Sequence, residues 1–323
     1  MAKRALIVGI NHYEHVNSLT GCVPDATEMQ SVLSRHWDGS SNYDCRLLVS
    51  PGPAPITKAF LRSQWRELFG DFRDDVLFYF SGHGCPTEVG GYLVTQDGTS
   101  DDPGLPMENV VTMANSSSAR TVLLILDCCF SGSLGNPASL QGGTVEDRAL
   151  LREGVTILAA SRPTEVSVET GGHGLFTNLV LGALRGGAAD VRGRVSAASI
   201  YAYAEAALGA WDQRPLYKSH AARLDPVRLC EPKVPDPLLR ELPNYFPRAD
   251  HEYRLDMTYE ETNLGAAVPA NVAIFKKFKQ LQIAGLLRPK AGSDLYWTAE
   301  RSGRVLLTDL GKFYLQLVNN NRI

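Results

Sequence analysis

The sequence contains no hydrophobic run long enough to cross a membrane and no excess of charge of either sign. No apolar run approaches the ~20 residues that a transmembrane helix needs, so a membrane-spanning protein is not expected. Lys plus Arg number 32 and Asp plus Glu 35, a net charge of −3, so no bulk field draws the chain to nucleic acid or to an anionic membrane. The apolar share of 44% and the charged share of 21% are those of an ordinary globular protein.

Cysteines are few, and their spacing excludes two common uses. The six lie at 22, 45, 85, 128, 129 and 230, without a C-x-x-C pair, and the one vicinal pair cannot easily form an ordinary disulfide. Neither a disulfide framework nor a metal site is indicated. The apolar run at 5–10 is too short for a signal peptide and is followed by no small-residue cleavage site. We therefore expect a reduced, cytoplasmic protein whose first segment is a strand.

Short, nearly continuous apolar runs alternate along the chain with amphipathic stretches. Continuous runs are typical of strands buried on both faces of a mainly parallel sheet. The expected strands are 4–10, 45–49, 75–80, 121–126 and 155–160, and the expected helices are 24–36, 57–70, 106–116, 174–185 and 196–209. Alternation of this kind predicts a layered α/β domain, in which ligands bind beyond the carboxyl ends of the strands.

Two polar motifs follow expected strands directly. SGHG (81–84) follows the third strand, and DCCFSG (127–132) follows the fourth. Thiol chemistry needs a thiolate and a proton-transfer partner that meet in space, and the strand ends of one parallel sheet would bring these motifs together. Alone, His83 would be an ordinary loop histidine and a buried cysteine a small hydrophobe. Together they favour a Cys–His dyad.

These motifs resemble the histidine and cysteine motifs of metacaspases and bacterial caspase-like peptidases. The resemblance implies a caspase-like three-layer α/β/α domain and makes the third residue of the D-x-C string, Cys129, the nucleophile. Caspases carry the histidine about 50 residues upstream of the cysteine, and here the separation is 129 − 83 = 46 residues. His83 would protonate the leaving amine, and the amides of Gly84 and Cys129 would form the oxyanion hole.

The segments GINHY (9–13) and LTGCVPDA (19–26) resemble the same family. By that match Asp25, Asp127 and Ser81 line the pocket for the substrate residue before the scissile bond. Two carboxylates favour Arg or Lys there, because a guanidinium can be held bidentately and an uncompensated buried pair is costly. The alternative for Asp25 is an N-cap of the helix expected at 24–36. Phe130 replaces the histidine common after the nucleophile, which suggests a divergent, bacterial branch.

The segment 131–153 has the composition of a long loop. Arg148 and Arg152 are candidate self-cleavage sites there, since such loops are often cut in the family; the alternative is that they are ordinary solvated arginines. Asp97, Asp101 and Asp102 do not form a calcium-binding string of the EF-hand kind. We expect no metal and no other cofactor, and the sequence does not support calcium activation.

The last third of the chain has a different composition. We predict a peptidase domain over 1–231, a Pro-rich linker over 232–247 and a winged-helix-like α+β domain over 248–323, built from a helix (270–287), a hairpin of two strands (295–299 and 304–308) and a last helix (308–318). Lys276, Lys277 and Lys279, with Arg301 and Arg304 of the hairpin, could contact phosphates.

A regulatory protein–protein module is the favoured role of this domain over nucleic-acid binding. The resemblance implies a regulated protease of the defence or cell-death kind that cuts a partner protein. Its rival is a catalytically silent caspase-fold scaffold that acts through the C-terminal domain.

Overall fold

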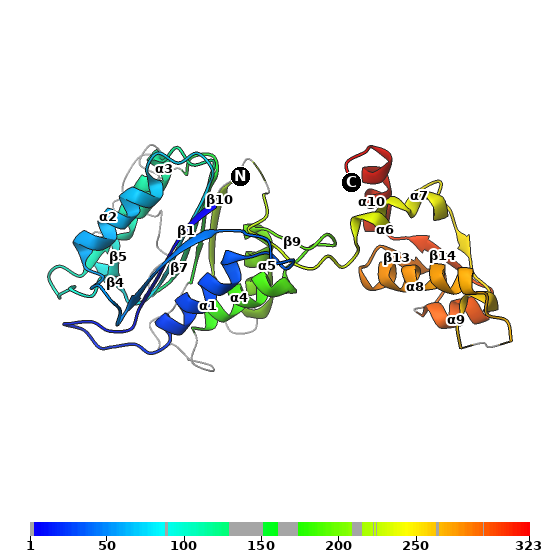
Figure 1. Ribbon diagram of the computed structural model, residues 1–323, viewed down its shortest axis with the longest axis horizontal. Helices are drawn as coiled ribbons and strands as arrows, with labels where there is room; N and C mark the ends of the chain where they lie inside the picture. Colours follow the sequence, from blue (N-terminus) through cyan, green and yellow to red (C-terminus); the bar gives the residue numbers. More distant parts are fainter. Residues whose placement is uncertain are drawn as a thin grey trace, which may run out of the picture. The chain divides into compact units, whose positions relative to one another are not determined.

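The computed structural model describes residues 3–87, 90–128, 151–160, 174–208, 215–221, 223, 225–262, 265–292 and 294–323. The chain divides into two compact units, 1–189 with 194–230, and 190–193 with 231–323. In Figure 1 the elements from β1 to β10 belong to the first unit and those from α6 to α10 to the second. No helix within the described ranges is long and apolar enough to cross a membrane.

A six-stranded sheet forms the centre of the first unit. Its order is β10-β8-β7-β3-β1-β2, with β10 antiparallel and the other neighbours parallel. The strands are β1 (Lys3–Ile10), β2 (Asp44–Ser50), β3 (Asp75–Ser81), β7 (Thr121–Asp127), β8 (Val155–Ala159) and β10 (Leu216–His220). All five expected strands are confirmed. The edge strand β10 was missed, because its sequence LYKSH has no buried apolar run.

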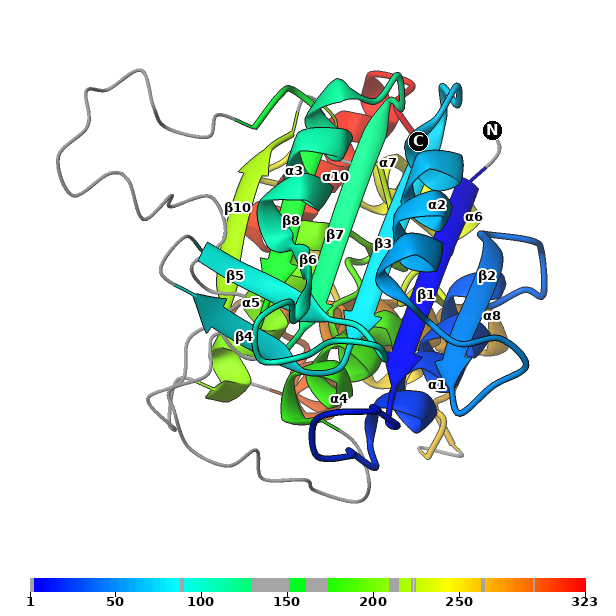
Figure 2. The ribbon, with the colours of Figure 1, turned by 90° about the vertical axis from the view of Figure 1, so that its left-hand side faces the viewer.

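Helices cover both faces of this sheet (Figure 2). Leu124 and Leu126 of β7 pack on the side of α2 and α3, whereas Leu123 and Ile125 pack on the side of α1, α4 and α5. The helices are α1 (Cys22–Ser34), α2 (Lys58–Phe69), α3 (Met107–Ser116), α4 (Leu175–Gly182), continued by a π-helical turn η4 (Ala183–Gly187), and α5 (Ala197–Leu208). Burial of successive residues on opposite faces explains the continuous apolar runs, and the predicted three-layer α/β/α architecture is confirmed.

Smaller strands complete the first unit. An antiparallel sheet of β4 (Gly84–Thr87), β5 (Gly90–Val94) and β6 (Gly104–Pro106) follows directly after β3, and β9 (Arg194–Val195) pairs with β11 (Arg228–Leu229). The β4–β6 sheet starts one residue after His83. It therefore fixes one end of the histidine segment.

The second unit begins at a stretch that the sequence predicts to be a linker, and that prediction is wrong. Residues 232–247 contain α6 (Asp236–Arg240) and α7 (Leu242–Tyr245), each with a proline in its first turn. Proline is tolerated there because the first helical N–H groups have no partner within the helix. Leu239 and Phe246 are fully buried. The prolines thus start helices in a folded segment.

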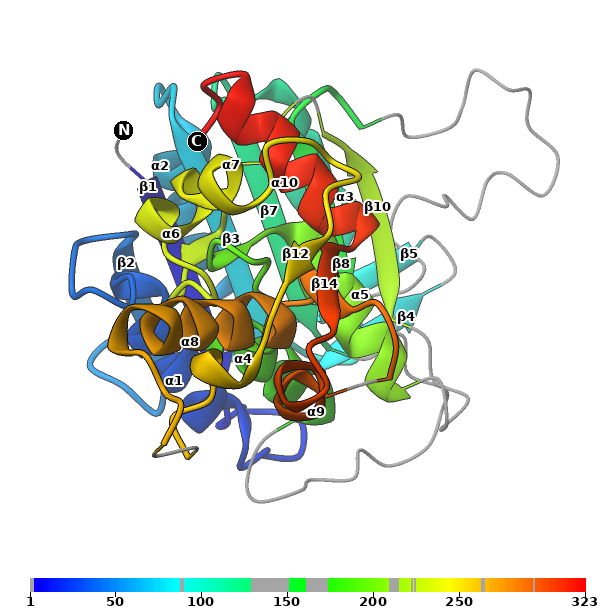
Figure 3. The ribbon, with the colours of Figure 1, turned by 90° about the vertical axis from the view of Figure 1, so that its right-hand side faces the viewer.

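The rest of the second unit also departs from the prediction. It contains β12 (Tyr253–Arg254), a 3-10 turn η5 (Met257–Tyr259), α8 (Pro269–Ile283), β13 (Leu287–Pro289), α9 (Leu295–Glu300), β14 (Arg304–Leu307) and α10 (Asp309–Asn319). The strands form one antiparallel sheet of order β12-β14-β13. Figure 3 shows β12 beside β14 in this sheet. The strand expected at 304–308 and the last helix are confirmed.

The predicted hairpin is wrong, because 295–299 is helical. The Asp294 side chain caps α9 by accepting from Trp297 N, and Leu295, Thr298 and Ala299 are buried at helical spacing. β14 consequently pairs with β13 and β12. A winged-helix module is not confirmed.

Candidate active site

The ends of β3 and β7 place two of the predicted site residues side by side. Ser81 ends β3 and is the register partner of Asp127, which ends the neighbouring parallel strand β7. Gly82 follows Ser81, and its backbone N–H donates to Asp127 O at 3.3 Å. A Cβ atom at Gly82 would lie 2.7 Å from the Tyr13 hydroxyl and 2.9 Å from Phe80. Only glycine fits this close approach.

His83 is held from two sides by the loop that follows β1. Its backbone N–H donates to the Tyr13 hydroxyl at 2.8 Å, and the two rings lie 4.9 Å apart between centroids. Its Nε2 lies 2.8 Å from the Asn17 carbonyl oxygen. Burial raises the pKa of the Tyr13 hydroxyl. A carbonyl oxygen only accepts, so Nε2 carries a proton in this bond and the neutral ring has Nδ1 as its acceptor.

The loop that carries Tyr13 and Asn17 is braced by Asn11. The Asn11 side chain accepts from Cys22 N at 2.9 Å and Val23 N at 3.1 Å, and donates to Thr20 O at 2.9 Å. These bonds satisfy the first N–H groups of α1, whose N-cap residue has no side chain. Asn11 thus fixes the loop between β1 and α1.

The predicted nucleophile, Cys129, lies outside the described residues. Cys128 is fully buried and packs in the core with α2 and α3. It continues the alternation of Leu124 and Leu126 on that face of β7, as a small hydrophobe does. The choice of Cys129 over Cys128, and the oxyanion role of the Gly84 and Cys129 amides, stay predictions.

Asp25 is buried in the first turn of α1, with 1% of its surface exposed. Its Oδ2 atom lies 3.3 Å from Ser81 Oγ and 3.2 Å from the backbone N of Gly174, and both donate to it. The alternative that Asp25 is an N-cap is wrong. The N-cap position belongs to Gly21, and the helix begins at Cys22 rather than at 24.

Asp127 is also buried, on the face of the sheet that α4 covers. Its Oδ2 accepts from the Thr177 hydroxyl at 2.6 Å and from the Thr177 N–H at 3.2 Å. The Tyr79 hydroxyl lies 2.7 Å from Thr177 Oγ1. Burial raises the pKa of Tyr79 well above its ordinary value, and the Asp127 and Asp25 charges raise it further. Asp25, Ser81 and Asp127 are therefore gathered at one sheet edge. Their role in a substrate pocket stays a prediction.

The structure describes only one of the two candidate self-cleavage residues. Arg148 lies outside the described residues. Arg152 is described, and its guanidinium donates to Ala114 O at 3.1 Å, Ala119 O at 2.7 Å and Ser117 Oγ at 3.0 Å. Three bonds to the last turn of α3 and to the residues that follow it make Arg152 a structural anchor, in contrast to the solvated arginine of the alternative.

Two of the three acidic residues considered for calcium, Asp97 and Asp102, have protein partners. Asp97 accepts from Thr95 Oγ1 at 2.7 Å and Lys58 N at 3.0 Å, and Asp102 pairs with the Lys58 ammonium. Within the described ranges, no group of three or more His, Cys, Asp or Glu side chains could hold a metal.

The lysines of α8 face carboxylates. Lys276 pairs with Glu261 at 2.7 Å, Lys277 with Glu241 at 2.5 Å, and Lys279 lies 3.6 Å from Glu260. The two arginines of the predicted hairpin have partners as well: Arg304, in β14, pairs with Glu252, and Arg301, at the end of α9, lies over the Trp297 ring. This pairing lowers the positive potential available to a phosphate backbone.

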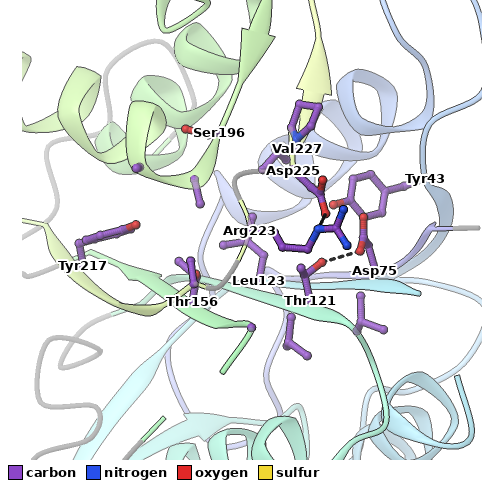
Figure 4. A pocket seen from close by; sticks show the side chains of 17 residues that line it. Tyr43, Asp75, Thr121, Leu123, Thr156, Ser196, Tyr217, Arg223, Asp225 and Val227 are labelled. Carbon is purple, nitrogen blue, oxygen red and sulfur yellow. Dashed lines mark hydrogen bonds and ion pairs between the residues drawn. The ribbon is translucent and has the colours of Figure 1, made fainter. Parts of the chain in front are cut away.

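A separate pocket of the first unit opens at the opposite sheet edge, where β3 and β7 begin (Figure 4). Asp75 accepts there from Arg120 at 2.8 Å and from the Thr121 hydroxyl at 2.6 Å. Arg223 Nε lies 3.7 Å from Asp225 Oδ2. The charged groups thus pair with one another. Among the described residues that line this pocket there is no cysteine and no histidine.

Three residues of the site escaped the sequence-based prediction: Tyr13, Asn17 and Thr177. Tyr13 lies inside the GINHY segment and Thr177 inside the helix expected at 174–185, so the sequence identifies their segments but not their roles. Asn17 acts through its backbone carbonyl. No side-chain pattern could have identified it.

Comparisons with known proteins agree with this geometry. A family model described as "Caspase domain" matches residues 2–224. Metacaspase-6 of Arabidopsis thaliana is 32% identical over 160 residues, which is 44% of this chain and 42% of that protein. Metacaspase-1 of Scheffersomyces stipitis is 33% identical over 90 residues, which is 26% of this chain and 22% of that protein.

A solved structure gives the fold. The crystal structure of caspase-1 from Spodoptera frugiperda superposes with a TM-score of 0.50 at 14% identity, covering 71% of this chain and 90% of that chain. At this identity the likeness concerns the fold alone. The chain spans less than half the length of each curated relative named above.

Proposed function

The chain belongs to the caspase-domain family, and we propose that it is a cysteine endopeptidase that cuts after Arg or Lys, with Cys129 as nucleophile and His83 as its proton-transfer partner. The observation that carries this proposal is the convergence at one sheet edge. His83 follows the end of β3, the D-x-C motif begins at the end of β7, and the buried carboxylates of Asp25 and Asp127 lie at the same edge.

The contacts of His83 support its role in the proposed mechanism. With Nε2–H bound to Asn17 O, Nδ1 takes the thiol proton and later gives it to the leaving amine. The Cys129 thiolate attacks the scissile carbonyl carbon and forms a thioester, which water then hydrolyses. The N–H groups of Gly84 and Cys129 stabilise the oxyanion.

Two buried carboxylates support a preference for substrates with Arg or Lys before the scissile bond. Asp25 and Asp127 are 1% and 2% exposed, and two carboxylates at one site favour a cationic ligand that compensates their charge. A substrate Arg or Lys before the scissile bond supplies that charge, whereas an Asp there would add a third carboxylate. The proposed specificity is therefore opposite to that of caspases that cut after Asp.

The second unit is proposed to be a regulatory or interaction module with a protein partner. It has its own hydrophobic core, centred on Phe246, Phe275 and Phe278. The pairing of the α8 lysines with carboxylates supports a protein partner over nucleic acid. In this proposal the activity of the peptidase is regulated. Arg148 is the preferred site of self-cleavage.

The test uses the purified chain beside Cys129→Ala and His83→Ala variants. Fluorogenic peptides ending in Arg, Lys or Asp are incubated with each protein, with and without calcium. We expect turnover of the Arg and Lys peptides by the unmodified chain only. Turnover that survives Cys129→Ala contradicts the proposal. So does the absence of turnover of every peptide after an added protease has cleaved the 131–153 segment, and that result leaves the catalytically silent scaffold.

A further inference from the structure

The two buried carboxylates at the candidate pocket bind the same short piece of backbone, the first turn of α4. Gly174 N donates to Asp25 Oδ2 at 3.2 Å, and Thr177 N donates to Asp127 Oδ2 at 3.2 Å. The N-cap residue, Gly174, has no side chain to cap the helix. The first N–H groups of a helix need acceptors. Here Asp25 from α1 and Asp127 from β7 supply them.

A second set of bonds fixes the orientation of Asp127. The Thr177 hydroxyl donates to Asp127 Oδ2 at 2.6 Å, and Tyr79 lies 2.7 Å from the same hydroxyl. Because the Thr177 proton is used toward Asp127, the Tyr79 hydroxyl is the donor to Thr177. Burial raises the pKa of Tyr79 well above its ordinary value, so it keeps that proton. Tyr79 and Thr177 are both 0% exposed.

We propose that Thr177, fixed by Tyr79, is a positioning residue for substrate specificity: it holds the Asp127 carboxylate in the orientation that receives the cationic side chain of the substrate. This rests on the proposed function, which assigns Asp25 and Asp127 to that pocket. Two donors from one residue converge on Oδ2 and prevent the carboxylate from rotating. A guanidinium is recognised by the plane of its partner carboxylate. A rotating carboxylate loses that fit.

The rival explanation is purely structural, since the same bonds also hold the start of α4. The two roles differ in what Thr177→Val changes. The backbone N–H of residue 177 still binds Asp127 in this variant, so α4 keeps that cap. The hydroxyl bond that fixes the carboxylate is lost. If Thr177 only caps α4, Thr177→Val should lose a little stability and bind a cation unchanged. If Thr177 positions Asp127, the variant should bind the cation more weakly.

Calorimetric titration of the full chain with benzamidinium, a planar amidinium cation, measures the pocket without requiring turnover. Thr177→Val is expected to weaken binding about 10-fold, the range for a hydrogen bond to a charged group. Tyr79→Phe, which leaves the Thr177–Asp127 bonds in place, is expected to weaken it about 3-fold. Thr177→Ser keeps the hydroxyl and is expected to bind within about 2-fold of the unmodified chain.

Thr156→Val is the matched control. Thr156 is a buried threonine of β8 whose hydroxyl bonds to Ser219 at 2.8 Å, and the control is expected to bind benzamidinium as the unmodified chain does. Equal affinity in folded Thr177→Val overturns the inference, and so does an unmodified chain that does not bind the probe. If Thr177→Val does not fold, unchanged affinity in Tyr79→Phe overturns it.

Failure of the proposed function has a different signature. A chain that binds benzamidinium in a Thr177-dependent way, yet shows no Cys129-dependent hydrolysis, contradicts the peptidase proposal and leaves the positioning role intact. If Thr177→Val and the unmodified chain hydrolyse Arg peptides with the same KM, the positioning role is overturned and the peptidase proposal stands.

Discussion

Tyr13 and His83 are joined by a hydrogen bond from the histidine backbone N–H to the tyrosine hydroxyl, 2.8 Å long, and by contact between their rings. The bond spans 70 positions of the sequence. It ties the loop after β1 to the segment after β3. The proposed proton-transfer residue is thus held by a group that takes no part in the reaction.

Tyr13→Phe should therefore lower kcat more than it raises KM. The phenyl ring keeps the contact with His83, but the backbone N–H loses its acceptor, a change worth about 1.5 kcal/mol or roughly 10-fold in rate. The measurement is kcat and KM against pH on an Arg peptide. Tyr43→Phe, a buried tyrosine at the other sheet edge, is the control. Equal kcat in both variants would show that the bond is dispensable.

Asp25→Ala should abolish the preference for basic residues. Removing one of two buried carboxylates takes away half of the charge that compensates the substrate cation, and we expect kcat/KM on Arg peptides to fall about 100-fold, within the range for buried charge pairs. Glu28→Ala, on the same helix, removes a pair with Arg185 and should leave activity unchanged. Unaltered Arg cleavage in Asp25→Ala refutes the pocket assignment.

Arg152→Ala should destabilise the first unit without affecting substrate binding. The guanidinium bonds to Ala114 O, Ala119 O and Ser117 Oγ are lost together, and buried acceptors are left unpaired at a cost of about 2–3 kcal/mol. Denaturant unfolding measures the change. Arg35→Ala, which loses one exposed bond to Gly39 O, should cost under about 0.5 kcal/mol.

Self-cleavage should occur after Arg148 and not after Arg152, because the Arg152 side chain must leave its three acceptors before it can enter a pocket. Mass spectrometry of the purified chain after incubation identifies the new ends. Cleavage after Arg152, in the unmodified chain or in an Arg148→Ala variant, would contradict the anchoring role. Cys129→Ala is the control for contaminating proteases.

Phe246→Ala should disrupt the second unit, although residue 246 lies in a Pro-rich stretch. Its ring is fully buried against Phe278 and Tyr253, and truncating a buried phenylalanine costs about 3–5 kcal/mol. Faster amide hydrogen exchange in α8 reports the loss. Phe313→Ala, at an exposed phenylalanine of α10, is the matched control. Equal protection in both variants would restore the linker interpretation of 232–247.

Cys45 should resist alkylation at pH 8. Burial raises the pKa of its thiol to about 11, and only the thiolate reacts. The thiolate fraction rises with pH, so labelling by iodoacetamide should increase steeply between pH 9 and 11, about 10-fold per unit below the pKa. Peptide mass spectrometry measures it. Rapid labelling of folded protein at pH 7 would show that the thiol is not protected by burial.

Much of the first unit could be predicted from the sequence. Five of the six strands of its central sheet are nearly continuous apolar runs, because both faces are covered, and SGHG and DCCFSG lie at the ends of two of them. The second unit was harder to predict. The prolines of 232–247 indicate a linker by composition, yet they occupy first turns of helices that bury Leu239 and Phe246. LYWTA (295–299) has strand-like composition, yet the Asp294 cap makes it a helix.

The sequence by itself determined the order of five strands of the central sheet and of the helices of the first unit, and it singled out the residues proposed to carry the chemistry, because local periodicity and motif position depend on neighbours along the chain. Only the tertiary structure decided how those residues are held. Asp127 meets Thr177 across 50 positions and His83 meets Tyr13 across 70. Such bonds arise from the register of parallel strands and from the helix packed over them, and sequence spacing encodes neither.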